Sequence, residues 1–312
     1  MRRLHFLVNP LAGRGKALKA WEQISAQLPR LQQAVENTDQ TFSYTHTFVG
    51  KNQPAPFPLL SPLLADDILV AIGGDGSVHH SAVLALQSGC ALGVVPTGTG
   101  NDFANFFGLS KEPLTAFDEV LNGSTQEVDV VSVNGQVLVN AGGFGLDASV
   151  VHFIEGHPRL KRLGPLGYAV SLPIVLGNFK TFSAVVAKAD REERFDNVSL
   201  VAIGNGPSFG GGMQVVPQAT PLDGEVDLCI VSGLNKLQLL RVFPSIYRGS
   251  HILNSHVHLR RVARVSIRLN RELDYGEFDG EPVHVERELD IQIQPKRLKL
   301  VVPRTFVRNR LP

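Results

Sequence analysis

Cysteine is scarce in this chain, and neither sign of charge is in excess. Only two cysteines, Cys90 and Cys229, occur among 312 residues, which excludes a disulfide framework or a cysteine-rich zinc module and indicates a reducing compartment. The formal net charge is +1, so bulk charge gives no reason to expect a nucleic-acid partner.

Long apolar runs are also missing. The longest, residues 168–179, is interrupted by Pro173 and Gly177 and is shorter than the roughly 20 residues that cross a bilayer. The apolar run that follows the basic start covers only residues 4–8. This run is too short for the apolar segment of a secretory signal peptide. We therefore expect a cytoplasmic protein without a membrane span. Peripheral contact with the inner face of a membrane stays open.

The first third of the chain alternates buried strands with amphipathic helices, which is typical of a parallel α/β sheet. The composition is that of an ordinary globular protein, and the length predicts two domains. Three of the expected strands run into glycine-rich turns, and ligands of open α/β sheets bind at the carboxyl ends of strands. The strands are expected at residues 4–8, 42–48, 68–72 and 91–95, and the helices at 16–28 and 78–86.

The character of the sequence changes from about Val128, where strands follow one another closely. Residues 262–269 alternate strictly between polar and apolar side chains, as in a strand with one wet and one dry face. We expect an antiparallel β-sandwich, interrupted by one helix around residues 160–176. Its other strands are expected at 126–133, 137–141, 183–189, 198–203, 225–231, 283–285 and 289–293.

The most informative segment is Gly73-Gly74-Asp75-Gly76-Ser77, which follows an apolar strand. Glycines at a strand end let the backbone approach a ligand closely, and the amides of such a turn suit a phosphate. A carboxylate in that turn would repel a phosphate unless a divalent cation lay between them. The segment therefore favours binding of a nucleotide with Mg²⁺. A tight turn in which Asp75 bonds its own backbone is the alternative.

Two other glycine-rich turns follow strands. Residues 9–16 are not a Walker A loop, because no Ser or Thr follows Lys16, and residues 96–102 lack the third glycine of a dinucleotide fingerprint. In the second turn, Asp102 is also a suitable N-cap for a helix starting at Phe103.

These segments together resemble the diacylglycerol kinase catalytic-domain family, and in particular its soluble bacterial lipid kinases. Sphingosine and ceramide kinases are more distant relatives. The resemblance lies in the order and spacing of NPLAGRGKA, GGDGS and PTGTGNDFA, and it continues with VD at 128–129, NAGGFGLD at 140–147, DGEVD at 223–227 and DGEP at 279–282. Any one of these motifs is weak, but the ordered set covers nearly the whole chain.

The resemblance implies an α/β nucleotide-binding domain over residues 1–127, to which 303–312 return, and a β-sandwich lipid-substrate domain over 128–302. It places the active site in the cleft between them, with ATP and Mg²⁺ as cofactors. The positions that match nucleotide-contacting residues of the family are Asn9, Pro10, Gly13, Thr47, Gly73, Gly74, Asp75, Gly76, Ser77, Thr99, Asn101 and Asp102.

The resemblance also implies catalytic and metal-binding residues. Asp75 and Asp129 match acids near the catalytic metal, and Glu281 matches the proposed general base. Asp223 matches the anchor of a separate structural Mg²⁺ site, to which backbone carbonyls near Thr220 and Glu225 contribute. A simple β-turn at residues 223–224 is the alternative there.

The sequence departs from the family pattern at His79-His80, where an amide and a carboxylate are usual. Adjacent helical residues point about 100° apart, so a role other than metal binding is favoured for this pair.

The function that these residues predict is transfer of a phosphate from ATP to a hydroxyl of diacylglycerol or a related membrane lipid. An NAD kinase-like enzyme and an inactive nucleotide- or lipid-binding protein are the alternatives, and a homodimer stays open. Two basic regions, the arginines at 260–268 and the basic C-terminus, suit contact with an anionic membrane, and solvated charge on exposed strands is the alternative. Residues 159–179 are basic first and apolar later, which fits a lipid-facing helix or, as is more usual, a helix packed on the sandwich.

Overall fold

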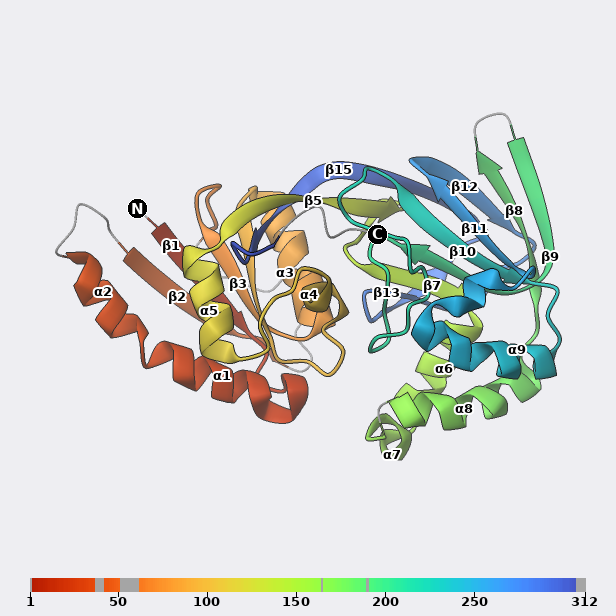
Figure 1. Ribbon diagram of the computed structural model, residues 1–312, viewed down its shortest axis with the longest axis horizontal. Coiled ribbons are helices and arrows are strands. Elements are labelled where there is room, and N and C mark those ends of the chain that lie inside the picture. Colours follow the sequence, from red (N-terminus) through yellow and green to blue (C-terminus); the bar gives the residue numbers. More distant parts are fainter. Residues whose placement is uncertain (1, 37–41, 51–61, 164, 189–190, 307–312) are drawn as a thin grey trace. The chain divides into compact units, whose positions relative to one another are not determined.

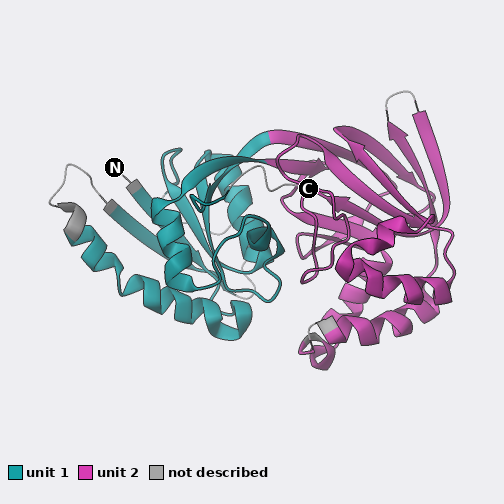
Figure 2. Cartoon of the chain, in the orientation of Figure 1, with its two compact units in different colours: residues 1–128, 296–312 teal, residues 129–295 magenta. Residues whose placement is uncertain are grey.

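The computed structural model describes residues 2–36, 42–50, 62–163, 165–188 and 191–306. The chain divides into two compact units, shown in two colours in Figure 2. Unit 1 comprises residues 1–128 and 296–312, and unit 2 comprises residues 129–295. Two strands, β5 (Ser124–Val133) and β15 (Glu288–Val302), contribute residues to both units, so each boundary falls inside a strand.

Unit 1 is built around a parallel sheet in the order β4-β3-β1-β2 (Figure 1). The second half of β15 extends this sheet, because Lys299 and Leu300 pair in parallel with the start of β4. The other strands are β1 (Arg2–Val8), β2 (Phe42–Phe48), β3 (Ile68–Gly73) and β4 (Ala91–Pro96).

Helices cover both faces of this sheet. Leu4, Phe6 and Val8 point to the face that packs against α1 and α5, while the alternate residue Leu7 is equally buried on the other face. Helix α3 packs against β3 and β4 and supplies the buried Val78. The helices are α1 (Lys16–Ser25), α2 (Leu28–Glu36), α3 (Asp75–Ser88), α4 (Asp102–Phe106) and α5 (Pro113–Asn122), with a 3₁₀ turn η1 (Ala12–Gly15).

The expected parallel α/β fold is confirmed. The expected helix over residues 16–28 corresponds to α1, which ends earlier, and a second helix that was not expected, α2, follows it. Helix α1 ends at Ser25 and α2 begins at Leu28. Pro29 explains the break, because proline has no N–H to donate to the carbonyl of Ser25 and its ring clashes with that preceding turn.

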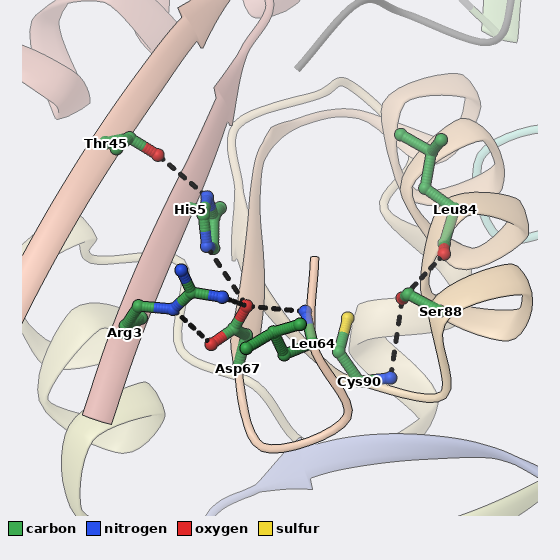
Figure 3. A network of polar contacts seen from close by, with 8 residues as sticks. All are labelled: Arg3, His5, Thr45, Leu64, Asp67, Leu84, Ser88 and Cys90. Atoms are coloured by element: carbon green, nitrogen blue, oxygen red, sulfur yellow. Dashed lines mark hydrogen bonds and ion pairs between the residues drawn. The ribbon is translucent and has the colours of Figure 1, made fainter. Parts of the chain in front are cut away.

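The amino-terminal edge of the same sheet is held by a polar network around Asp67 (Figure 3). Arg3 donates Nε–H to Oδ1 at 2.8 Å and Nη2–H to Oδ2 at 2.7 Å, and the N–H of Leu64 donates to Oδ2 at 2.7 Å. His5 Nε2 lies 3.3 Å from Oδ2, and its Nδ1 contacts Thr45 Oγ1 at 2.8 Å. Burial raises the pKa of Asp67, but the bonds from Arg3 and Leu64 outweigh it, so this pKa lies below its ordinary value.

Unit 2 is an antiparallel β structure, as expected (Figure 1). Its strands follow the order β14-β13-β7-β9-β8-β12-β15, and β10 pairs with both β9 and β11. The strands beyond β5 are β6 (Gln136–Leu138), β7 (Ala141–Gly145), β8 (Phe182–Lys188), β9 (Arg191–Gly204), β10 (Val226–Ser232), β11 (Val257–Val262), β12 (Arg264–Leu269), β13 (Leu273–Phe278) and β14 (Glu281–Val285).

The helices of unit 2 are more numerous than the single one expected. They are α6 (Leu146–Glu155), α7 (Pro158–Lys161), α8 (Pro165–Asn178) and α9 (Lys236–Val242), with 3₁₀ turns η2 (Phe243–Arg248) and η3 (Ser250–Leu253). Helices α6 and α8 pack through Leu146, Val150, Leu172 and Leu176, which form a small core of their own. Within the ranges that the structure describes, no helix has the length and apolar character needed to cross a membrane.

Candidate functional site

The three glycine-rich turns of unit 1 lie together at the carboxyl ends of β1, β3 and β4. Backbone bonds join them in register, since the N–H of Asn9 donates to the carbonyl of Ile72 at 3.1 Å and that of Thr97 donates to Gly73 at 2.8 Å. The side-chain amide of Asn9 also reaches Ser77 Oγ at 3.4 Å. The turns that the sequence placed on separate strands therefore form one surface at one edge of the sheet.

The glycines in these turns allow backbones to approach closely. A Cβ atom on Gly74 would lie 3.1 Å from the Cα of Gly98, and one on Gly98 would lie 2.6 Å from the Cα of Gly74. A Cβ on Gly73 would collide with Ser77, and Gly13, at a φ of 58°, lies against the carbonyl of Thr97. Only glycine keeps this surface bare of side chains, as a phosphate cradle of backbone amides requires.

Asp75 is oriented by the neighbouring turn. It is the first residue of α3, and its Oδ2 accepts a 2.9 Å hydrogen bond from the N–H of Asn101. Asn101 adopts the left-handed conformation, with a φ of 54°, and its side chain bonds both the N–H and the carbonyl of Gly98. The carboxylate thus has a fixed place beside the glycine turns, at the start of a fourteen-residue helix.

Asp102 is not the N-cap of the following helix. Helix α4 begins at Asp102 itself, and Asn101 occupies the capping position although its side chain is engaged with Gly98. The reason is the left-handed backbone conformation of Asn101. After this residue the chain enters the helix at Asp102, one residue before the expected start at Phe103. Asp102 is buried, and its role in nucleotide binding stays a prediction.

The remaining expected nucleotide contacts lie at the same edge. Thr47 is in register with Leu7 near the end of β2, Pro10 and Gly13 follow β1, and Thr99 is exposed within the third turn. Gly76 belongs to the first turn of α3, where its carbonyl contacts the ring of His80.

The His79-His80 pair has a local structural role at His80. Its Nδ1 lies 2.7 Å from the carbonyl of Gly76, one turn earlier in α3, and the two rings meet edge to face. This contact engages one ring nitrogen of His80 within the first turns of α3. That the pair has a role other than metal binding stays a prediction.

In unit 2, Glu281 follows a tight hairpin turn between β13 and β14. Asp279 and Gly280 both have positive φ, as a two-residue turn of this kind requires. The carboxylate of Asp279 is buried and accepts hydrogen bonds from the N–H groups of Val139, Asn140 and Ala141 at 2.7, 2.8 and 3.2 Å. Asp279 therefore fixes the turn that presents the half-buried Glu281, a function that the sequence did not assign to it.

Asp129 lies beside the turn at Asp223-Gly224 within unit 2. It is buried, and its Oδ2 accepts a 2.7 Å bond from the N–H of Gly224. Its backbone N–H donates to the carbonyl of Pro221. The structure thus brings the expected catalytic acid Asp129 together with the expected structural metal anchor Asp223, and its grouping with Asp75 stays a prediction.

The acidic turn around Asp223 contains an arginine counter-ion, and its expected Mg²⁺ site stays a prediction. Burial raises the pKa of Asp223 and of Asp227, although Arg261 donates to Asp227 Oδ1 at 3.1 Å and lies 3.8 Å from Asp223. Thr220 Oγ1, in the same turn region, is buried without a hydrogen-bond partner in the described chain. Arg261 therefore lies within ion-pair distance of more than one carboxylate of this turn. No set of three or more His, Cys, Asp or Glu within the described ranges has the arrangement of a metal site, so a cation here would need backbone carbonyls and water as further ligands.

An apolar cavity in unit 2 is lined by α8, α9 and β9, and has an empty volume of about 620 Å³, part of which is open to solvent. Asp147 is one of the residues that line it, and Glu277 of β13 is not. Burial raises the pKa of Asp147, on its wall, to about 7, and burial with the nearby charge of Asp147 raises that of Glu277 to about 8. Only burial distinguishes these acids from surface ones, and burial is not visible in the sequence.

Comparison with known proteins agrees with this architecture. The model of the diacylglycerol kinase catalytic domain matches residues 3–133, and that of the YegS C-terminal NAD kinase beta sandwich-like domain matches residues 140–302. A crystal structure of a diacylglycerol kinase from Bacillus anthracis superimposes with a TM-score of 0.65 over 98% of each chain, at 17% identity, and supports the fold.

Sequence relatives extend over most of the chain. A protein named "Diacylglycerol kinase" from Bacillus subtilis is 28% identical, over 95% of this chain and 97% of its own length. One named "Probable lipid kinase YegS-like" from Stenotrophomonas maltophilia is 30% identical, over 76% of this chain and 79% of its own.

The fold and the relatives define a kinase, a phosphotransferase whose acceptor is an alcohol group. More narrowly, the chain belongs to the diacylglycerol kinase family, alongside the YegS-like lipid kinases. The family inferred from the ordered motifs is confirmed.

Proposed function

We propose that this protein transfers the γ-phosphate of ATP, with Mg²⁺, to a hydroxyl of diacylglycerol or a closely related membrane lipid. The observation that carries the proposal is the glycine surface of unit 1, where three turns meet beside an oriented carboxylate. The names of the relatives support the lipid acceptor.

The donor side follows from the geometry of unit 1. Backbone amides of the turns and the positive end of α3 favour a polyphosphate at this edge. Asp75 and the water shell would hold Mg²⁺, which usually binds one or two carboxylates together with the phosphates of the substrate. When bound, that ion neutralises charge on the triphosphate.

The acceptor side depends on Glu281. Its carboxylate orients the lipid hydroxyl and accepts the hydroxyl proton as the new P–O bond forms. Proton transfer is late in a loose phosphoryl-transfer transition state, so a weak base suffices. Asp279 keeps this carboxylate in place through its three backbone bonds.

The test is transfer of labelled phosphate from ATP and Mg²⁺ into a panel of lipids in mixed micelles. The panel contains diacylglycerol, phosphatidylglycerol, ceramide and a sphingoid base, with NAD as a soluble acceptor. We expect labelled diacylglycerol or a related lipid. Labelled NADP would replace the proposal with the NAD kinase-like alternative.

Glu281→Gln separates chemistry from binding. We expect kcat to fall by about 10²-fold or more while ATP affinity is nearly unchanged, because the amide cannot accept the proton. Glu288→Gln, an exposed position in the same unit, is the matched control and should leave kcat unchanged. Equal loss of kcat and ATP affinity, or loss of neither, would refute the role of Glu281.

A further inference from the structure

Two carboxylates of unit 2 lie in the protein without a cationic partner. Asp147, in the first turn of α6, is 7% exposed, and its Oδ1 is buried with no hydrogen-bond partner in the described chain. Glu277, in β13, is half-buried. Among the residues that the structure describes, no Lys, Arg or His forms an ion pair with either carboxylate. If both were ionised, their negative charges would be unbalanced.

The two acids meet at Gly143 of β7. A Cβ atom on Gly143 would lie 3.3 Å from Oδ2 of Asp147, so this carboxylate lies directly over the bare backbone of that strand. Glu277 is paired with Gly143 in the antiparallel ladder, and residues directly opposite one another point to the same face of a sheet. Asp147 and Glu277 are therefore neighbours on one face, as the effect of the Asp147 charge on the pKa of Glu277 also indicates.

The other ionisable groups that the structure describes around the pair supply no positive charge. They are acids, phenols and a thiol, namely Glu155 of α6, Tyr168 of α8, Cys229 of β10, Tyr247 of η2 and Asp279 after β13. Strand β7 has no ionisable side chain, and residues 200–204 of β9, which pair with it, have none either. His251 lines the cavity together with Asp147, and burial holds its pKa below the ordinary value, so this ring is neutral. The charge of the pair is therefore decided by its own protons.

Burial favours the uncharged form of both acids. It raises the pKa of Asp147 to about 7, although backbone N–H groups at the start of α6 bond the carboxylate and favour its ionised form. Burial, together with neighbouring acidic charges, raises the pKa of Glu277 to about 8, and a backbone bond from Gly280 opposes this shift only in part. Interacting acids release their protons as a pair, so near neutral pH the two carboxyl groups together hold at least one proton.

Glu277 is connected to the turn that presents the proposed base Glu281. The backbone N–H of Gly280, the residue before Glu281, bonds the Glu277 carboxylate. The next residue along β13, Phe278, pairs both with Glu281 across the hairpin and with Gly142 of β7. A displacement of Glu277 from β7 would therefore move this turn, and with it the carboxylate of Glu281.

Helix α6 is fixed to both strands at this place (Figure 1). It begins directly after β7, packs against β7 and β13, and carries His152, which stacks on Tyr275 of β13 with 3.9 Å between the ring centroids. Two ionised carboxylates in such a partly buried place repel one another strongly, because little water screens them. The repulsion is relieved only when Glu277 turns toward solvent or α6 moves off β13, and either change disturbs the turn at residues 279–280.

From these observations we infer that Asp147 and Glu277 are a proton-sharing pair that positions Glu281, and that loss of the shared proton in mildly alkaline solution releases the turn and lowers turnover. Both act through the turn at residues 279–280, so they are positioning residues. The pair and its titration stand on unit 2 alone. Only the effect on turnover rests on the proposed function.

Urea unfolding at several pH values tests the pair without reference to activity. In the unfolded chain both acids ionise near their ordinary pKa values, about 4, whereas the folded protein retains their protons to higher pH. The stability that these groups contribute is therefore greatest at low pH. It is lost as the pH rises from about 4 through the folded pKa values, about 7 and about 8.

The amide variants Glu277→Gln and Asp147→Asn imitate the protonated acids and cannot ionise. One retained proton changes the unfolding equilibrium constant about tenfold per pH unit, and we expect each variant to lose a dependence of this size between about pH 5 and 7. At pH 9 each should resist urea better than the wild type does. Asp274→Asn, which changes an exposed acid of the same strand, is the matched control and should keep the wild-type dependence.

Infrared spectra report the proton directly. The carbonyl band of protonated carboxyl groups, recorded near neutral pH, should be weaker in both amide variants than in the wild type and in Asp274→Asn. A band of equal strength in all four proteins would show that the pair holds no proton and would overturn the inference.

Turnover supplies the second arm, with a water-soluble short-chain diacylglycerol as acceptor. We expect kcat of the wild type and of Asp274→Asn to fall about tenfold between pH 7 and 9, as the protonated fraction of Glu277 falls. The KM for ATP should change little, because the glycine turns belong to unit 1. In Glu277→Gln this alkaline fall in kcat should be absent.

Equal pH dependence of unfolding in the wild type and both amide variants would overturn the pair. An alkaline fall in kcat that persists unchanged in the amide variants would overturn its positioning role. A wild type that phosphorylates no lipid at any pH would refute the proposed function together with the effect on turnover, whereas the urea and infrared measurements would still decide whether the pair holds a proton.

Discussion

The two edges of the parallel sheet in unit 1 are built in opposite ways. At the amino-terminal edge, a buried carboxylate is enclosed by Arg3, His5 and a backbone N–H, and its charge is balanced within the protein (Figure 3). At the carboxyl edge, glycines leave the backbone bare and Asp75 is held by a backbone N–H. A carboxylate bonded to its own counter-ion stabilises a fold, whereas one set among bare amides suits a charged ligand.

The largest expected effect comes from Asp75→Asn at the carboxyl edge. The amide keeps an oxygen that can accept from Asn101 but loses the charge, so we expect kcat/KM to fall by about 10²–10³-fold with little change in Tm. The measurement is steady-state kinetics at several Mg²⁺ concentrations, alongside thermal unfolding. Full activity in this variant would show that the carboxylate has no part in the chemistry.

The amino edge should show the reverse pattern. Asp67→Asn removes the negative charge beside Arg3 and one bidentate acceptor, and we expect about 2–4 kcal/mol less unfolding free energy. Urea unfolding measures this loss, while kcat of the remaining folded protein should be unchanged. A loss of kcat as large as that of Asp75→Asn would break the contrast between the two edges.

A smaller effect is expected at the acidic turn of unit 2. Saturating Mg²⁺ should stabilise the wild type by about 1 kcal/mol, and Asp223→Asn should abolish most of that gain. Thermal unfolding with Mg²⁺ and with a chelator measures it, without reference to activity. If Mg²⁺ does not stabilise the wild type, the metal site at this turn is refuted, and Arg261 alone is the counter-ion of its carboxylates.

The smallest effect concerns pH. Burial lowers the pKa of His5, so the folded state disfavours its protonation, and the stabilisation present above the ordinary value of about 6.5 is lost as the pH falls through the lower folded pKa. Unfolding free energy should therefore decline as the pH falls below about 6.5, and less steeply in His5→Gln. Identical slopes would assign the decline to other groups.

Several features of unit 1 were predictable because they depend on local patterns. The strand at 42–48 and the helix after the glycine turn follow from periodicity and glycine placement, and the meeting of the turns follows from a parallel sheet. The break at Pro29 and the start of α4 at Asp102 were missed, because backbone geometry at single residues decided them.

Unit 2 was less predictable. Asp279 reads as an ordinary turn residue, yet it binds three N–H groups from a segment about 140 residues earlier. Asp147 and Glu277 read as surface acids, and burial raises their pKa values. Such contacts depend on which segments the fold brings together, and no local pattern records that.

The sequence by itself determined the family, the α/β and antiparallel classes of the two units and the glycine turns, because these rest on residue order and on the backbone freedom of glycine. Only the tertiary structure decided which charges are balanced, which acids are buried, and that Leu166, Val170 and Ile174 of α8 are exposed. Burial and pairing are properties of neighbours in space, and an apolar helix has the same sequence whether its outer face is covered or bare.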